Sequence, residues 1–148
     1  MSPIVTKPEF RAPADILEKE VERLNVPLPK AAVTVAAAPI LGTWVNCDHH
    51  SRGLVRLMIT AAGTEVMIHG FGACTPTPCD WGAVAGLIYA DNVAATPAVA
   101  FSAVYSFTFK QTTVVGRLLN GALFVETFDH FTDKSGRADY YSMNILTQ

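Results

Sequence analysis

The chain has 148 residues, of which 50% are hydrophobic and 16% are charged, and its formal net charge is −2. This length and hydrophobicity predict one folded domain and exclude a disordered chain. Without a basic excess, neither nucleic acid nor an anionic membrane surface is an expected partner. No uninterrupted apolar run reaches the roughly 20 residues that cross a bilayer, so no membrane span is predicted.

Residues 1–38 are predicted to form an extension in front of the folded domain. Within it, residues 13–25 have a helical period, with Leu17, Val21 and Leu24 on one face. A helix of about three turns is marginal alone. It is expected to pack on the folded domain or on a neighbouring subunit, and the alternative is a docking segment for a larger partner. Residues 26–38 read as a Pro/Ala linker.

The beginning of the chain carries charges of both signs and lacks the apolar segment of a signal peptide. Residues 30–42, KAAVTVAAAPILG, imitate such a segment with an Ala-x-Ala site, but they follow a long acidic stretch. We therefore expect a cytoplasmic protein, with secretion as the alternative.

From Leu41 onward, apolar and polar residues alternate and turn residues recur at even intervals. No helical pattern interrupts them, and hairpin follows hairpin. For residues 39–148 this predicts an all-β domain, an eight-stranded antiparallel up-and-down β-barrel, with a sandwich as the alternative. The strands are predicted at 41–47, 53–60, 64–73, 82–90, 98–109, 112–119, 122–131 and 138–147.

Turn chemistry predicts which residues face inward. Asn120-Gly121 fits a type I′ turn, which pairs Leu118 with Leu123. A two-residue turn at Lys110-Gln111 would pair Tyr105 with Gly116, where the glycine leaves room for the ring. The interior predicted from these pairings is Phe101, Tyr105, Phe107, Phe109, Val114, Gly116, Leu118, Leu123, Val125, Thr127 and Asp129.

The outer face of the same strands carries Arg117 and Glu126, which are predicted to form an exposed ion pair worth at most about 1 kcal/mol. A turn at Ala62-Gly63 gives two further sets of residues. It places Val55, Leu57, Ile59, Val66 and Ile68 inside. It leaves Leu54, Arg56, Met58, Met67, His69 and Phe71 outside.

The apolar members of that outer set are too numerous for a solvated surface. They predict a homo-oligomer, most simply a dimer, that buries a shared face. The face consists of Leu54, Met58, Met67 and Phe71.

Two cysteines, Cys74 and Cys79, flank a Thr-Pro-Thr-Pro segment. Structural zinc sites use two closely spaced pairs, and Cys47 is the one cysteine left. A redox Cys-x-x-Cys motif needs two intervening residues, which is not the spacing here. We predict a structural clasp between the third and fourth strands, with buried free thiols in the cytosol and a disulfide if the compartment allows it.

Other motifs carry little chemistry. Trp81 either packs beneath the clasp or forms a wall of a ligand site. The side chains of Asp48-His49-His50 alternate in direction, so a solvated loop is expected rather than a metal site. His69 and His130 are expected at the surface or an interface. Gly70-Phe71-Gly72 precedes no helix, so phosphate binding is not predicted, and no nucleophile motif, metal or cofactor is expected.

The first predicted strand, Gly42-Thr43-Trp44-Val45-Asn46, resembles the Gly-x-Trp signature of the calycin barrels, which include lipocalins, fatty-acid-binding proteins and avidins. With Ser51 following, it is most similar to the avidin version. The resemblance implies a barrel that is closed at one end and open to a small ligand at the other. It also implies that Asn46 and Ser51 contact a polar group of that ligand.

We predict that a small, largely apolar molecule binds in the lumen of the barrel. Two alternatives remain: a cofactor-independent cyclase or isomerase, since holding a substrate in a reactive shape needs no catalytic triad, and a structural or assembly module with a filled core. Catalytic residues are not assigned. The predicted ligand contacts are Trp81, Tyr105, Phe107 and Tyr141, with Asn46 and Asp129 at the polar end.

Overall fold

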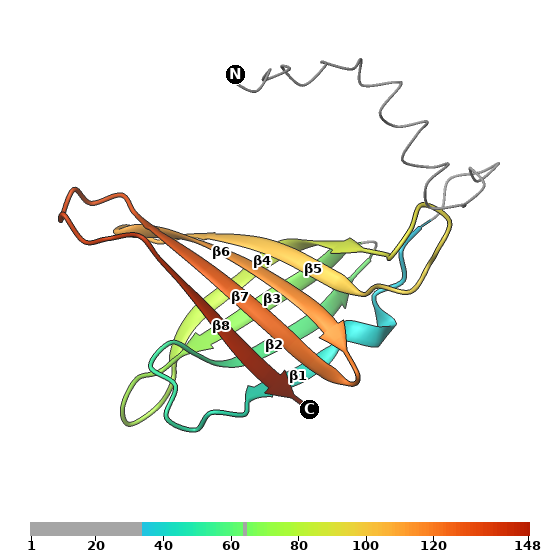
Figure 1. Cartoon of the computed structure of the whole chain (residues 1–148), viewed down its shortest axis with the longest axis horizontal. Helices are drawn as coiled ribbons and strands as arrows, with labels where there is room; N and C mark the ends of the chain where they lie inside the picture. The colour runs from blue at the N-terminus through green and yellow to red at the C-terminus, as the bar shows by residue number, and fades with distance from the viewer. Residues whose placement is uncertain (1–33, 64) are drawn as a thin grey trace, which may run out of the picture.

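The computed structural model describes residues 34–63 and 65–148. Eight antiparallel strands follow one another around a closed barrel, and the last pairs with the first (Figure 1). This confirms the predicted all-β up-and-down barrel, an architecture compatible with the calycin type. The helix predicted at residues 13–25 lies outside the described residues. The strands are β1 (Gly42–Asn46), β2 (Leu54–Ala62), β3 (Glu65–Gly72), β4 (Cys79–Tyr89), β5 (Ala100–Ser106), β6 (Lys110–Leu119), β7 (Ala122–Phe131) and β8 (Tyr140–Thr147).

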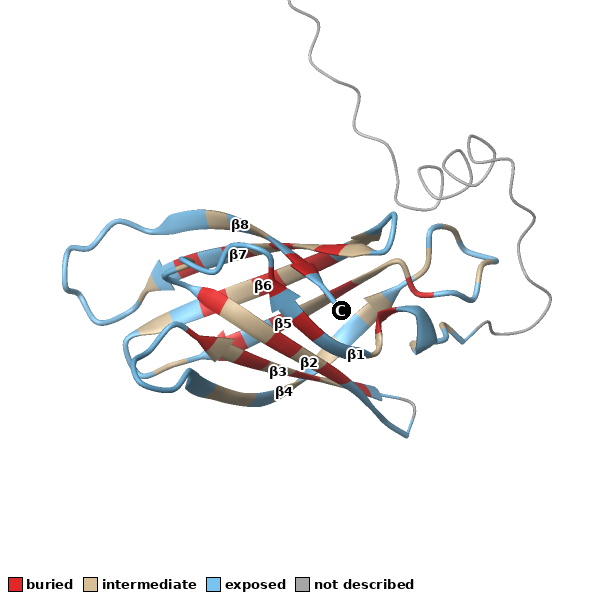
Figure 2. Cartoon of the chain, turned by 90° about the horizontal axis from the view of Figure 1, so that it is seen from below, coloured by how far each residue is buried: buried red, intermediate tan, exposed pale blue. Residues whose placement is uncertain are grey.

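Buried residues alternate with more exposed ones along most strands, as a pleated strand with one face on the core requires (Figure 2). The turn between β6 and β7 has the predicted geometry, because Asn120 and Gly121 both have positive φ, 50° and 79°. Leu118 pairs with Leu123 as predicted. On the outer face of this hairpin, Arg117 and Glu126 form the predicted ion pair at 3.7 Å, with Arg117 exposed and Glu126 partly exposed.

The register predicted between β5 and β6 was wrong. The turn lies at residues 107–109, where the Phe107 N–H donates to the Lys110 carbonyl, so Phe101 pairs with Gly116 and Tyr105 with Thr112. A shift of four residues keeps the same face inward, and Phe101 and Tyr105 are therefore buried as predicted. Phe109 was also placed inside, but it lies in the turn and is 40% exposed.

The β2–β3 hairpin shows a second correction. Its core residues Leu57, Ile59, Val66 and Ile68 are buried as predicted. At the beginning of β2, however, the pairing is irregular between Leu54 and Arg56, so Val55 drops out of the ladder. An extra residue reverses the alternation beyond it. Leu54, predicted to face outward, is consequently buried at 2% exposure, and Val55 is half-buried rather than inside.

The same bulge changes the predicted oligomer surface. Leu54 now belongs to the core, while Met58, Met67 and Phe71 stay half-buried. The homo-oligomer remains a prediction, without Leu54 as a contact.

One end of the barrel is closed by a short 3-10 helix, η1 (Ala38–Ile40). Ile40 is fully buried in the apolar core, and its carbonyl accepts a hydrogen bond of 2.9 Å from the Trp44 indole nitrogen. Ala36 in front of the helix forms a bridge with Pro97 in the loop between β4 and β5. Among residues 34–63 and 65–148, no helix has the length and apolar content that a membrane crossing requires.

The opposite end, called the mouth below, is formed by the loops 47–53, 73–78, 107–109 and 132–139 (Figure 1). The ladder is long between most strands, with ten residue pairs between β6 and β7. It is shortest where the barrel closes, because β1 and β8 share two pairs, Val45 with Thr147 and Asn46 with Leu146. We call this short pairing the seam.

Candidate functional site

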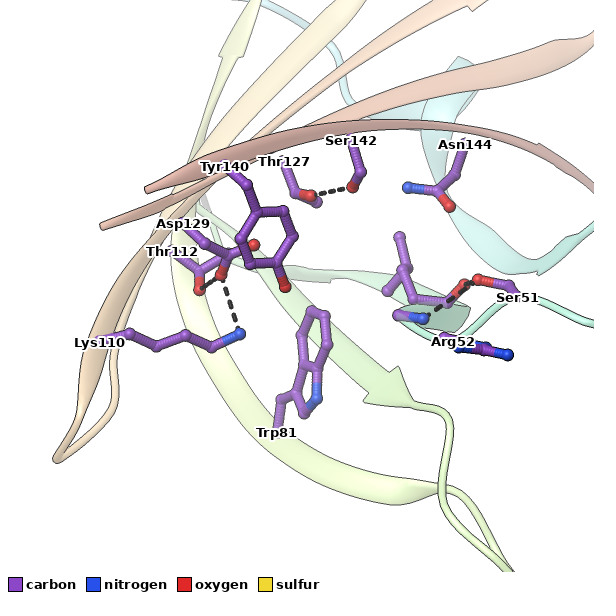
Figure 3. A pocket seen from close by; sticks show the side chains of 12 residues that line it. Ser51, Arg52, Trp81, Lys110, Thr112, Thr127, Asp129, Tyr140, Ser142 and Asn144 are labelled. Carbon is purple, nitrogen blue, oxygen red and sulfur yellow. Dashed lines mark hydrogen bonds and ion pairs between the residues drawn. The ribbon is translucent and has the colours of Figure 1, made fainter. Parts of the chain in front are cut away.

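A cavity of about 310 Å³ enters the barrel at the mouth (Figure 3). Its outer lining includes Arg52 and Tyr140, which are exposed, and its inner lining includes Thr112 and Asp129, which are buried. The cavity therefore leads from solvent to polar side chains inside the barrel. The full lining is Ser51, Arg52, Gly53, Leu54, Trp81, Lys110, Thr112, Thr127, Asp129, Tyr140, Ser142 and Asn144.

Trp81 forms a wall of this cavity and lies over the backbone of β3. A Cβ atom at Gly70 would come within 2.6 Å of the indole Cε3, and one at Gly72 within 2.6 Å of its Nε1. These two glycines are therefore what allows the indole to lie inside the barrel. The ring edges pack on Tyr105 and Phe107 at centroid distances of 5.7 and 6.0 Å. Trp81 therefore packs against its neighbours and also lines the cavity, while its contact with a ligand stays a prediction.

The bend that turns Trp81 inward is held by its neighbours. The Asp80 carboxylate accepts the Gly82 N–H at 2.7 Å and contacts the His69 ring nitrogen at 2.5 Å. Gly82 has φ of +81°, which favours glycine. The Gly82 N–H and, next, the His69 ring lower the pKa of Asp80 below its usual value. Asp80-Trp81-Gly82 thus forms a hydrogen-bonded bulge in β4, opposite the irregular pairing between His69 and Phe71.

Tyr105 lies behind the wall and is not among the residues that line the cavity. Its hydroxyl donates to the Ile68 carbonyl at 2.7 Å and accepts the Gly70 N–H at 2.9 Å. Burial raises the pKa of Tyr105, against the opposing effect of the Gly70 N–H. Phe107 stacks on Tyr105 at 5.6 Å. Two predicted ligand contacts therefore support Trp81 from behind.

Asp129 reaches the cavity as predicted. Its Oδ1 accepts a 2.5 Å hydrogen bond from Thr112 and a 2.9 Å ion pair from Lys110. The carboxylate side chain is 4% exposed and the Lys110 side chain 17%. A buried carboxylate needs such partners. Lys110 was missed as a site residue because the sequence placed it in a turn.

Asn46 and Asn144 form a bond across the seam. Asn46 Nδ2 donates to the Leu54 carbonyl at 2.7 Å, and its Oδ1 accepts the Asp48 N–H at 2.9 Å. These two backbone partners fix which way the Asn46 amide points. Its Nδ2 also donates to Asn144 Oδ1 at 3.1 Å. Asn46 therefore positions Asn144 and does not itself line the cavity.

The Asn144 amide nitrogen is consequently turned away from Asn46, toward the middle of the cavity (Figure 3). It is buried and has no hydrogen-bond partner among the described residues. Beside it, the Thr127 and Ser142 hydroxyls are 2.5 Å apart. Ser51, implicated by the calycin resemblance, lines the cavity and donates to the Leu54 carbonyl at 3.1 Å.

Tyr141 was predicted to contact the ligand, and the structure places it outside the barrel. It is 54% exposed, and its hydroxyl donates to Glu126 at 3.3 Å. Asp129 pairs with Tyr140, so Tyr140 shares its inward face and lines the cavity instead. The loop 132–139 is longer than the interval 132–137 between the predicted strands, and no turn signal fixed the register of β8.

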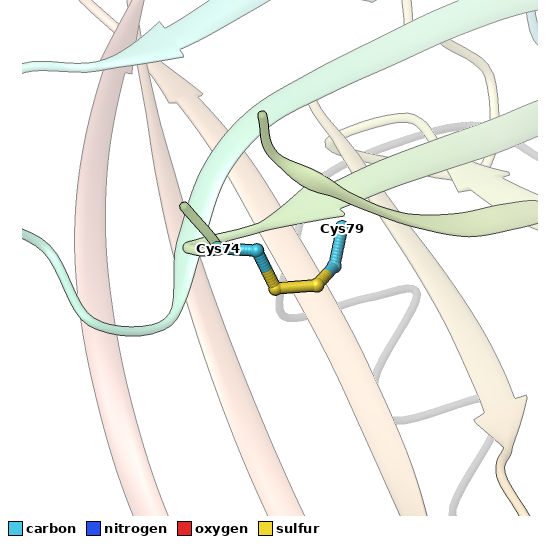
Figure 4. The surroundings of a disulfide bond; sticks show 2 residues. All are labelled: Cys74 and Cys79. Carbon is cyan, nitrogen blue, oxygen red and sulfur yellow. A yellow bond between two sulfur atoms is a disulfide. The ribbon is translucent and has the colours of Figure 1, made fainter. Parts of the chain in front are cut away.

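The clasp joins the ends of β3 and β4, where Gly72 pairs with Cys79. Cys74 and Cys79 form a disulfide with their Cα atoms 5.3 Å apart (Figure 4). Both cysteines are exposed, so the expectation of buried free thiols was wrong. They border a second hollow of about 340 Å³, and the residues that it shares with the cavity are Arg52, Gly53, Trp81, Lys110 and Tyr140.

The histidines lie away from the cavity. His49 and His50 occupy the exposed loop 47–53, His69 contacts Asp80, and His130 pairs with Asp139 at 2.7 Å on the surface. Within residues 34–63 and 65–148, no group of three His, Cys, Asp or Glu side chains comes close enough to hold a metal ion.

The chain matches no family model, no curated protein and no solved structure. Its function is therefore inferred from the geometry and chemistry of the cavity at the mouth.

Proposed function

We propose that the protein binds a small molecule in the cavity at the barrel mouth. The observation that carries the proposal is the Asn144 amide nitrogen, a buried donor that Asn46 holds in place and that has no described partner. Leaving such a donor unsatisfied costs about 1–3 kcal/mol. An acceptor on a bound molecule would remove that cost.

The cavity has the size of a small-molecule site. Its volume of about 310 Å³ lies at the lower end of the range for ligand pockets. Trp81 supplies an aromatic wall, and most of the other lining side chains are polar, several of them held by hydrogen bonds. The similarity of the first strand to calycin barrels supports the same function.

The core limits where the ligand lies. Toward the closed end, Ile40, Phe101 and Leu123 are fully buried in one apolar cluster. The ligand therefore occupies the mouth end of the lumen. It meets polar groups as well as Trp81, so it is less apolar than the strand pattern alone predicted.

A cofactor-independent isomerase or cyclase is the second candidate, and one observation favours it. Asp129 and Lys110 lie at the cavity as a carboxylate–ammonium pair. Such groups move protons within a bound molecule when they lie within hydrogen-bond reach of it. In that case Asp129 accepts a proton from the substrate and Lys110 stabilises the resulting charge.

Native mass spectrometry with extraction of bound small molecules tests both candidates. A binding protein returns the molecule unchanged, whereas an enzyme returns a product that Asp129→Asn no longer forms. Asn144→Leu, which keeps the shape and removes the donor, should lower occupancy. Gln111→Met on the exposed outer face of β6 is the matched control. A protein that retains nothing and responds to no compound in a thermal-shift panel contradicts the proposal.

A further inference from the structure

Charge and hydrogen-bond donors are unequally distributed around the cavity. Two cations, Arg52 and Lys110, and one carboxylate, Asp129, line it, which leaves one net positive charge. Asp129 is already paired with Lys110 at 2.9 Å. Arg52 forms no ion pair with a residue in the part of the chain that the structure describes. The uncompensated charge therefore belongs to Arg52.

The two uncommitted donors lie on the same side of the cavity. Figure 3 shows Arg52 and Asn144 on one side and the Lys110–Asp129 pair on the other, with Trp81 between them. Asn144 offers a buried N–H without a partner. A planar acceptor such as a carboxylate suits both groups, because it accepts several hydrogen bonds and pairs with a guanidinium.

The wall between the two sides suits a flat group. Trp81 is held over Gly70 and Gly72, and its ring edges pack on Tyr105 and Phe107, so its position is set by four neighbours. An aromatic ring packs on such an indole in an offset or edge-to-face arrangement.

Resting on the proposed function, we propose that the ligand class is a flat aromatic carboxylate. Its carboxylate lies between Arg52 and the Asn144 amide, and its ring packs on Trp81. A purely apolar molecule leaves the Asn144 donor unsatisfied. An ammonium meets two cations on the lining and an amide that presents its donor side.

Four probes that share one ring test this class: naphthalene-2-carboxylate, 2-naphthamide, 2-methylnaphthalene and 2-naphthylmethylammonium. Affinity is measured by titration calorimetry and by tryptophan fluorescence. The carboxylate should bind about tenfold more tightly than the methyl compound, the difference expected for one charge-assisted hydrogen bond. The ammonium should bind most weakly.

Two variants separate the contribution of the Asn144 hydrogen-bond donor to affinity from that of the Arg52 charge. Asn144→Asp replaces the donor with a carboxylate, so the carboxylate probe should lose about tenfold in affinity and the ammonium should gain. Arg52→Gln lies on the exposed rim and spares the fold. This variant should lower the affinity of the carboxylate probe and leave the affinity of 2-naphthamide unchanged. The control variant Gln111→Glu makes the same amide-to-acid change on the outer face. It should alter the affinity of neither the carboxylate probe nor the ammonium probe.

The outcomes distinguish the two proposals. Equal affinity for all four probes, or an unchanged affinity of the carboxylate probe in Arg52→Gln, overturns the carboxylate class and leaves small-molecule binding intact. Failure of every probe, together with a retained molecule in native mass spectrometry, overturns the aromatic class alone. Failure of every probe without a retained molecule overturns the proposed function itself.

Discussion

The ring of Phe101 lies against the backbone of its pairing partner on the next strand, Gly116. A Cβ atom on Gly116 would collide with three atoms of that ring and come within 2.6 Å of Cζ. Because Phe101 is fully buried, its ring has no free space to enter. The pair therefore works as one packed unit in which the glycine is required by its neighbour.

The first prediction is that Gly116→Ala lowers the free energy of unfolding by about 1–3 kcal/mol, because it overpacks this unit. Urea denaturation measures the loss. Gly53→Ala is the matched control, since no atom lies within 4 Å of a Cβ there. Combined with Phe101→Leu, the alanine should cost less than it does alone. A Gly116→Ala protein as stable as the wild type would contradict the packing of this pair.

A second prediction concerns the clasp. Replacing Cys74 and Cys79 by serine should lower the free energy of unfolding by about 2 kcal/mol, the loop-closure value for a short loop, and leave ligand binding largely intact. Dithiothreitol should destabilise the wild type equally and leave the double variant unaffected. If the reductant shifts neither urea midpoint, the thiols are not bonded in the isolated protein. The cytoplasmic location stays a prediction. Disulfides persist mainly in oxidising compartments, so the bond between Cys74 and Cys79 favours the alternative, secretion.

The third prediction is a pH dependence at Asp80. Its pKa is lowered in the folded protein, so the unfolded chain binds its proton first as the pH falls. The stabilisation is full above the unfolded value near 3.8 and is lost as the pH falls through the lower folded pKa. Urea unfolding of the wild type and of Asp80→Asn, followed from pH 6 downward, should show a gap that narrows below pH 3.8. A gap independent of pH would exclude the Asp80–Gly82 contact as its cause.

The fourth prediction tests Asn46 as a positioning residue. Asn46→Ala removes the donor to the Leu54 carbonyl and should cost about 1–3 kcal/mol of stability. It should also release Asn144, so that discrimination between the carboxylate and methyl probes falls while 2-methylnaphthalene binds as before. Thr43→Ala, at an exposed position of the same strand, is the control. Retained discrimination in Asn46→Ala would show that Asn144 is oriented without it.

Much of the barrel follows from local patterns. The alternation of apolar and polar residues located all eight strands. The Asn120-Gly121 pair predicted a two-residue turn, because both turn positions require positive φ, and that turn sets the register of β6 against β7. The failures occur where no residue type marks the geometry. The three-residue turn at 107–109 contains no glycine or asparagine, and the bulge at Val55 falls within a mainly apolar stretch, residues 54–59, that has no turn residue.

The site was partly predictable for the same reason. Trp81 directly follows the Cys74–Cys79 segment, which marks a connection between two strands. Asp129 lies in β7, whose register the Asn120-Gly121 turn sets. Asn144 was missed because its orientation depends on Asn46, 98 residues away, and no local pattern records such a contact. An inward-facing asparagine on the last strand was the available signal, but it required the β8 register, which the loop 132–139 concealed.

The seam links ligand binding in the cavity to local opening of the barrel between β1 and β8. Two residue pairs close the barrel between β1 and β8, and the Asn46–Asn144 bond crosses the same line. Opening there carries Asn144 away from the cavity, so a molecule held by Asn144 opposes opening by a free energy that rises with the logarithm of its concentration once the site is filled. Amide exchange should report this at Cys47, whose N–H donates to Ile145 across the line, while amides deep in the β6–β7 ladder exchange at unchanged rates.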